Sequence, residues 1–265
     1  MIVERTVTTA QGTLRVLDAG AGWPVLLIHA FPLSADMWRP QLEAVPQGWR
    51  YVAPDLRGFG RSPAGPTPPG VDDYAADVEA VLDALEIETA TIGGLSMGGY
   101  VTFALHRRAP ERFTSLVLAD TKAEADTADG RDARRKMSAL VNERGVGAVA
   151  DSMLPKLLSE QSRTSELPGV VRALIEGNSV QGVDHAIQAL MTRPDSTGDL
   201  ATLRLPVLVI VGEEDALTPR ADSERIVAAT ERSQLVVVPG AGHLSNLEAP
   251  AAFSTALANF LRSSL

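Results

Sequence analysis

The sequence predicts an α/β protein whose central sheet is mostly parallel and is flanked by helices. Three observations support this. Short, continuously apolar runs recur along the chain, as expected for strands buried on both faces of a parallel sheet. Segments with helical periodicity lie between several of these runs. One interval of about eighty residues contains helical patterns without a convincing strand, which is too long for an unstructured loop in a compact domain.

The N-terminal part alternates apolar and polar side chains over residues 2–9 and 13–19, around Gln11-Gly12, and this pattern predicts a β-hairpin. Five short runs, most of them continuously apolar, then predict buried strands, at residues 25–28, 51–53, 89–92, 116–118 and 207–211. Helical periodicity predicts four flanking helices, at residues 74–85, 97–108, 219–229 and 249–261.

The interval without a strand predicts a helical insertion. Its helical stretches are residues 130–144, 146–158, 168–178 and 183–193. We therefore expect a core made of residues 1–120 and 201–265, with residues 121–200 forming a helical cap, or lid, over one end of the sheet. Apolar side chains of such a cap would wall a substrate pocket, and Met153, Leu157 and Leu190 are the candidates.

Composition excludes several classes of function. The 265 residues include 24 Lys and Arg against 33 Asp and Glu, a formal net charge of −9, which argues against nucleic acid as a partner. The absence of cysteine excludes disulfides, thiolate metal sites and a cysteine nucleophile. The charged start of the chain is unlike a secretory signal, and no stretch is apolar enough to cross a membrane, so we expect a cytoplasmic protein.

The sharpest local motif is Gly94-Leu95-Ser96-Met97-Gly98, a G-x-S-x-G sequence between a predicted strand and a predicted helix. Such a tight turn holds the serine in a strained backbone conformation, and small flanking residues let neighbouring backbone pass close by. Gly94 and Gly98 meet that requirement. Ser96 is therefore the candidate nucleophile.

A serine nucleophile needs a base, and the chain has four histidines. His29 ends a buried strand, and His106 and His185 lie in predicted helices, where structural or surface roles are expected. His243 differs, because it lies in the glycine-containing loop Pro239–His243 before the last helix, from which an imidazole can reach a site. We expect His243 to be the base, with a pKa near the ordinary imidazole value of about 6.5.

The base in turn needs a carboxylate that orients it. Glu213, Glu214 and Asp215 directly follow the predicted strand at residues 207–211. Asp215 is preferred, because its short side chain in the turn before Thr218-Pro219 is easily held rigid. The sequence has no metal-type histidine spacing and no dinucleotide-binding glycine motif, so no cofactor and no metal is expected.

The order Ser96, Asp215, His243 and two further motifs resemble the α/β-hydrolase fold over essentially the whole chain. The segment His29-Ala30-Phe31-Pro32 is similar to the family's His-Gly-x-Pro, with Ala30 where glycine is usual, and residues 55–62 match its D-x-R-G-x-G-x-S loop. The resemblance implies that the backbone N–H groups of Phe31 and Met97 form the oxyanion hole.

Two segments of the sequence resemble particular groups of proteins within that family. Residues 33–38 resemble bacterial esterases and cofactor-free haloperoxidases or perhydrolases, and residues 242–248 resemble 3-oxoadipate enol-lactonases. The expected function is hydrolysis of a small-molecule ester or lactone; perhydrolysis at the same site and a non-catalytic, ligand-binding signalling role are the alternatives. Trp38 is assigned either to the substrate pocket or to the core.

Overall fold

The computed structural model describes residues 1–10 and 12–264, and these form an eight-stranded sheet in the order β1-β2-β4-β3-β5-β6-β7-β8. The strands are β1 (Ile2–Thr9), β2 (Gly12–Gly20), β3 (Trp23–Ile28), β4 (Trp49–Pro54), β5 (Ala90–Leu95), β6 (Phe113–Ala119), β7 (Val207–Gly212) and β8 (Ser233–Val238). The β1–β2 and β2–β4 pairs are antiparallel and the other neighbours are parallel. The predicted mostly parallel sheet is confirmed.

The predicted N-terminal hairpin is also confirmed, since β1 and β2 pair from Ile2 opposite Ala19 to Thr9 opposite Gly12. Gln11, which we expected in its turn, lies outside the described residues. Strands β3, β5, β6 and β7 follow, and their side chains are almost entirely buried. A strand covered on both faces needs no polar alternation, which explains the continuous apolar runs.

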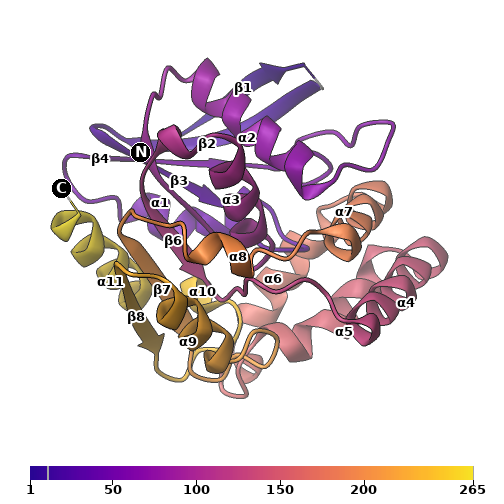
Figure 1. Cartoon of the computed structure of the whole chain (residues 1–265). Coiled ribbons are helices and arrows are strands. Elements are labelled where there is room, and N and C mark those ends of the chain that lie inside the picture. The colour runs from indigo at the N-terminus through magenta and orange to yellow at the C-terminus, as the bar shows by residue number, and fades with distance from the viewer. Residues whose placement is uncertain (11, 265) are drawn as a thin grey trace.

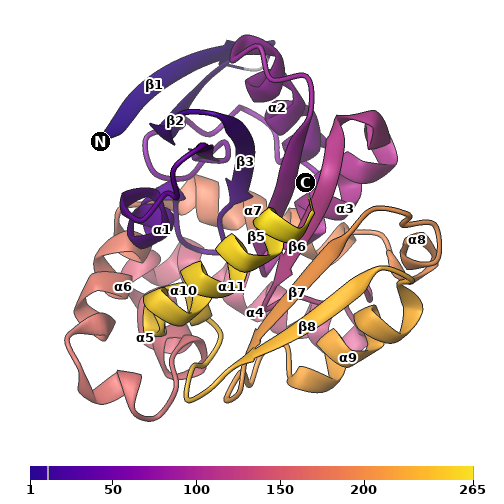
Figure 2. The ribbon, with the colours of Figure 1, turned by 90° about the vertical axis from the view of Figure 1, so that its left-hand side faces the viewer.

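Helices cover both faces of the sheet. The principal ones outside the insertion are α1 (Arg39–Glu43), α2 (Val71–Ala84), α3 (Met97–Arg108), α9 (Arg220–Ala229) and α11 (Pro250–Ser263). α1 and α11 lie on one face and α2, α3 and α9 on the other (Figures 1 and 2). No described helix is long and apolar enough to span a bilayer.

The insertion between β6 and β7 is helical, as predicted. It contains α4 (Ala128–Arg144), α5 (Val146–Leu157), α6 (Leu167–Glu176), α7 (Val180–Thr192) and the short α8 (Thr197–Leu200). α4 to α7 gather beyond one end of the sheet (Figure 1). The α4 helix begins at an N-cap, Thr127, whose hydroxyl accepts the Gly130 N–H, and α7 begins in the same way at Ser179.

Two close contacts attach the inserted helices to the core. The Asn178 side chain donates to the Pro32 carbonyl at 2.8 Å and accepts the Gly60 N–H at 2.7 Å. Gly182 lies so close to Gly58 that an added Cβ would come within 1.8 Å of the Gly58 carbonyl oxygen. These contacts hold α7 against the loops that follow β3 and β4.

The sequence analysis missed several elements. The edge strand β8 was not predicted, and neither were the short helices α1, α8 and α10 (Ser245–Glu248) nor the single 3₁₀ turns η1 (Ala35–Trp38), η2 (Pro110–Arg112) and η3 (Ser162–Thr164). Strand β5 continues through Gly93 and Gly94, whereas the sequence predicted its end at Ile92. A Cβ on Gly93 would come within 2.2 Å of the Val117 carbonyl oxygen on β6, so this strand position requires glycine.

Candidate active site

Ser96 lies at the turn between β5 and α3 with φ 56° and ψ −112°, a conformation that L-residues rarely adopt. A Cβ on Gly94 would come within 2.5 Å of Gly98, and a Cβ on Gly98 within 2.2 Å of the Ile28 carbonyl oxygen. Both positions therefore require glycine, because neighbouring backbone lies too close to leave room for a side chain. A strained residue of this kind costs about 1–3 kcal/mol, which the surrounding structure must offset.

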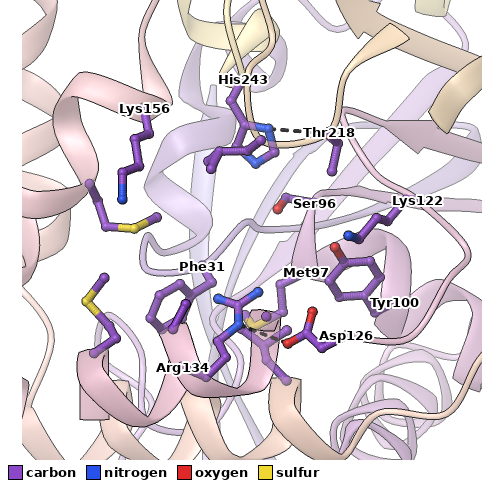
Figure 3. A pocket seen from close by; sticks show the side chains of 16 residues that line it. Phe31, Ser96, Met97, Tyr100, Lys122, Asp126, Arg134, Lys156, Thr218 and His243 are labelled. Carbon is purple, nitrogen blue, oxygen red and sulfur yellow. Dashed lines mark hydrogen bonds and ion pairs between the residues drawn. The ribbon is translucent and has the colours of Figure 1, made fainter. Parts of the chain in front are cut away.

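Hydrogen bonds from neighbouring strands fix this turn. The Ser96 N–H donates to the Ala119 carbonyl at 2.9 Å, and the Thr121 hydroxyl donates to the Ser96 carbonyl at 2.8 Å. Both partners lie at or just beyond the end of β6. The serine backbone is thus held from β6, while its side chain faces a cavity (Figure 3).

His243 and Asp215 form a buried pair at the ends of the next two strands. Asp215 follows β7 and His243 follows β8, and His243 Nδ1 lies 2.9 Å from Asp215 Oδ2 and 3.0 Å from Oδ1. The side chains are 2% and 0% exposed. Because an ionised carboxylate only accepts hydrogen bonds, Nδ1 carries the hydrogen and Nε2 keeps a free lone pair.

Thr218, which the sequence analysis did not assign a role, completes the support of this pair. Its hydroxyl donates to Asp215 Oδ2 at 2.6 Å and lies 3.3 Å from His243 Nδ1, and its N–H donates to Asp215 Oδ1 at 3.0 Å. Burial raises the pKa of the Asp215 carboxyl, but His243 and these hydrogen bonds outweigh burial and hold it below its ordinary value. Asp215 is therefore an ionised acceptor at neutral pH.

The two glutamates beside Asp215 point elsewhere. Glu213 accepts the Gly240 N–H at 3.0 Å and Glu214 accepts the Glu160 N–H at 3.3 Å, and both side chains are exposed. Of the three acids that follow β7, the structure brings only Asp215 to His243.

Ser96 and His243 line the same cavity, which has a volume of about 210 Å³ and lies between the strand ends and the inserted helices (Figure 3). Within residues 1–10 and 12–264 no hydrogen bond joins the Ser96 hydroxyl to His243. In enzymes without substrate, such catalytic hydrogen bonds are often long and shorten only when substrate binds. Deprotonation of Ser96 by His243 requires the two groups to come within hydrogen-bond distance of each other.

The pH dependence of this site follows from the charge beside His243. Burial lowers the pKa of the imidazole, but the Asp215 carboxylate raises it by more, and the net direction is upward from 6.5. The sequence analysis expected a value near 6.5. Since only the neutral imidazole accepts a proton, activity should rise with pH, with a midpoint above about 6.5.

This prediction is measured as kcat/KM between roughly pH 5 and pH 9 with an uncharged ester, so that only the protein titrates. A midpoint at or below 6.5 would contradict the effect that we assign to Asp215.

Two backbone N–H groups at the cavity have no hydrogen-bond acceptor among the residues that the structure describes. Met97 is the first residue of α3, where helical N–H groups lack intrahelical partners, and the Phe31 N–H donates to no acceptor in the described part of the chain. The Ala30 N–H is engaged by Met37 Sδ at 3.2 Å. Ala30 has no positive φ, so alanine fits here without backbone strain. Phe31 and Met97 are thus available as oxyanion donors.

Asp120 is a buried acid that the sequence analysis did not single out. It follows β6, accepts the Gly212 N–H at 2.7 Å and accepts the Ser245 hydroxyl, and it is 0% exposed. Burial and the Asp215 charge raise the pKa of Asp120 well above its ordinary value. Because Gly212 leads into the Asp215 loop and Ser245 follows His243, Asp120 connects the segments that carry both. The signal was available, since a carboxylate after a buried parallel strand lies at the sheet edge where sites form.

The predicted pocket residues divide into two pairs. Met153 on α5 and Leu190 on α7 line the cavity. Trp38 is instead 1% exposed in the core, with its ring 5.7 Å from that of Phe253. Leu157 is fully buried at the end of α5, away from the cavity wall, and its carbonyl accepts the Leu244 N–H at 3.2 Å. Of the two alternatives for Trp38, the structure therefore shows the core. The expectation that Leu157 lines the pocket was wrong, because its side chain packs in the protein interior.

Comparisons with known proteins agree with this architecture. A family model described as the alpha/beta hydrolase fold matches residues 24–250. The 3-oxoadipate enol-lactonase 2 of Acinetobacter baylyi is 32% identical over 257 residues, covering 95% of this chain and 94% of that protein. The non-heme chloroperoxidase of Streptomyces lividans is 33% identical over 239 residues, covering 82% and 84%.

Among solved structures, a thermophilic esterase from Thermogutta terrifontis with malate bound is 36% identical, with a TM-score of 0.93 over 100% of this chain and 99% of that one. The fold, the strained serine turn and these full-length similarities lead to one conclusion: the chain belongs to the α/β-hydrolase family.

Proposed function

We propose that the protein is a serine hydrolase that cleaves small carboxylic esters or lactones through an acyl-enzyme on Ser96. The observation that supports this most strongly is the buried Asp215–His243 pair at the same cavity as Ser96. A histidine with only a structural role does not require a buried, ionised carboxylate beside it. Asp215 is such a carboxylate, and it accepts hydrogen bonds from both the N–H and the hydroxyl of Thr218. The names of the relatives, an esterase and an enol-lactonase, support the same class of substrate.

In the proposed mechanism, His243 Nε2 takes the proton of the Ser96 hydroxyl as Oγ attacks the substrate carbonyl. The negative charge that develops on the carbonyl oxygen is stabilised by the N–H groups of Phe31 and Met97. Collapse of the tetrahedral intermediate breaks the ester bond, and His243 gives the proton to the leaving alcohol. Water activated by His243 then attacks the acyl-enzyme and regenerates Ser96.

Residues 121–200 serve in this proposal as a cap that limits the substrate. Met153 and Leu190 supply apolar wall, while the core supplies the reacting groups. The cavity volume of about 210 Å³ is below the range of about 300–1,000 Å³ usual for pockets that hold drug-sized ligands. The substrate is accordingly a small molecule with a short acyl chain.

Perhydrolysis is a second candidate, favoured by the relative named non-heme chloroperoxidase. Hydrogen peroxide would replace water in the attack on the same acyl-enzyme and release a peroxy acid. This activity requires Ser96 as much as hydrolysis does, so it is a variant of the same chemistry.

The function is tested with p-nitrophenyl esters of increasing acyl length and with simple lactones, after exhaustive treatment with EDTA. We expect turnover that survives EDTA, because no step uses a metal, and a kcat/KM that falls steeply once the acyl chain exceeds the cavity. The matched control is a Ser96→Ala variant. Absence of turnover on every ester and lactone, by a folded protein, would overturn the proposal and favour a ligand-binding role.

A further inference from the structure

Glu248 holds the backbone on both sides of His243. Its carboxylate oxygen Oε1 accepts the Gly242 N–H at 2.9 Å and the Leu244 N–H at 3.2 Å, and these two residues come immediately before and after the histidine. The glutamate is the last residue of α10, and its side chain is half-buried. One carboxylate oxygen therefore fixes two N–H groups that flank the proposed base.

The other oxygen of the same carboxylate reaches the inserted helices. Glu248 Oε2 accepts the N–H of Ser159, which lies just after α5, at 2.8 Å. The Leu244 N–H also lies 3.2 Å from the Leu157 carbonyl oxygen at the end of α5. A Cβ on Gly242 would come within 2.6 Å of the Ser159 nitrogen. The loop that carries the base and the end of α5 are thus in direct contact, and the glutamate hydrogen-bonds to both.

Helix capping explains only part of this arrangement. A glutamate in the first turn of a helix can accept the N–H of the N-cap residue, and Leu244 is the N-cap of α10. Capping gives no reason for the same carboxylate to accept the N–H groups of Gly242 and Ser159, which lie outside that helix. A carboxylate that accepts three N–H groups from two parts of the chain is suited to hold those parts in a fixed relation.

The charge of Glu248 also acts on the imidazole. Burial lowers the pKa of His243, and the carboxylates that face it raise that pKa. These carboxylates come from three places in the fold: Asp215 after β7, Asp120 after β6, and Glu248 at the end of α10. Removal of the Glu248 charge should therefore lower the pKa of His243 while its Asp215 partner stays in place.

We propose that Glu248 is a positioning residue, which sets the place of the His243 imidazole relative to Ser96 and joins it to α5. Glu248 is not among the described residues that line the cavity, so we expect it to act through His243. Because α5 also carries Met153 on the cavity wall, the same contacts fix the base relative to that wall. This inference rests on the proposed function, since His243 is the base of that mechanism.

The test compares Glu248→Gln and Glu248→Ala with the wild type on p-nitrophenyl acetate. An amide has one acceptor oxygen, so glutamine can satisfy either the loop or Ser159, and kcat should fall about threefold to tenfold. Alanine satisfies neither, and kcat should fall about 10- to 100-fold with little change in KM. The midpoint of the pH profile of kcat/KM should move to lower pH in both variants, because a negative charge beside His243 is lost.

Glu213→Gln and Glu213→Ala are the matched controls, because the exposed Glu213 accepts the Gly240 N–H of the same loop without contacting the neighbours of His243. Both should keep the kcat and the pH midpoint of the wild type. Equal losses in Glu213→Ala and Glu248→Ala would overturn the proposal. A lower thermal stability of both Glu248 variants, with kcat and pH midpoint unchanged, would also overturn it, because Glu248 would then have only a structural role.

A measurement without turnover separates this proposal from the proposed function. In a Ser96→Ala background, Glu248→Gln should lower the pKa of the His243 ring measured by NMR titration. Amide hydrogen exchange should become faster over residues 157–160 and 242–244. Both results are expected even if no ester is hydrolysed. An unchanged His243 pKa together with unchanged exchange would contradict the role of Glu248, and Glu248→Gln decides the question if Glu248→Ala fails to fold.

Discussion

Replacing Ser96 by alanine should lower kcat for ester hydrolysis by about 10⁶-fold, because the bond-forming oxygen is lost. The remaining groups can still bind substrate and polarise its carbonyl. We therefore expect a residual rate that is about 10³–10⁴-fold higher than that of the uncatalysed reaction. The substitution removes only the hydroxyl and keeps Gly94 and Gly98, which permit the close backbone contacts of the strained turn. The fold should therefore persist. The measurement is kcat on p-nitrophenyl acetate, with circular dichroism to check folding.

Ser223→Ala is the matched control for this experiment. Ser223 is buried on α9, and its hydroxyl has no hydrogen-bond partner in the described part of the chain, so its loss should leave kcat unchanged. If Ser96→Ala retained a kcat close to that of the wild type, the nucleophile would have to be another group or a water molecule.

Replacing Asp215 by asparagine should lower kcat by about 10⁴-fold with little change in the fold. The asparagine carbonyl can still accept the Thr218 N–H, which lies 3.0 Å from Asp215 Oδ1. Its amide NH₂, however, donates to His243 Nδ1 and forces the hydrogen onto Nε2. The imidazole then presents a donor to Ser96 and cannot act as its base, and it also loses the charge that stabilises the imidazolium.

Glu213→Gln and Glu214→Gln are the matched controls, since both acids are exposed and accept backbone N–H groups that an amide oxygen can also accept. Both variants should keep nearly full activity. A large loss in Glu214→Gln would mean that the orienting acid is misassigned. Retention of activity by Asp215→Asn together with its loss in Asp120→Asn would assign that role to Asp120 instead.

The sequence was most informative where one chemical requirement dominates. The turn at Ser96 requires small neighbours and a strand-to-helix transition, and these leave a local pattern that can be read without tertiary information. The buried parallel strands leave continuous apolar runs for a similar reason. The eighty-residue interval predicted the helical insertion because an unstructured loop of that length is rare.

The sequence was least informative where tertiary packing decides. Gly93 marks a strand end by local propensity, yet the structure keeps it in β5 because Val117 of β6 passes too close for a side chain. Edge strand β8 is only half-buried, so it lacks a fully buried pattern, and its apolar run was overlooked. Trp38 and Leu157 are apolar residues that follow the cavity-lining Phe31 and Met153 closely in sequence, and only packing shows that they face the core.

Three basic residues that line the cavity of Ser96 illustrate the same limit. Lys122, Arg134 and Lys156 are separated along the chain and belong to a loop and two helices, so no sequence spacing links them. Each one alone is most simply interpreted as a solvated surface residue. They meet at the cavity of Ser96 because α4 and α5 lie over the end of the sheet.

The most direct test of the account is covalent labelling with a fluorophosphonate followed by mass spectrometry of peptides. We predict one label per chain on the Ser96 hydroxyl, loss of esterase activity in proportion to labelling, and no label in Ser96→Ala. Labelling should also be about 10⁴-fold slower in Asp215→Asn, because the same base activates the serine toward the probe. A label on any other residue, or a label that persists in Ser96→Ala, would contradict an acyl-enzyme on Ser96.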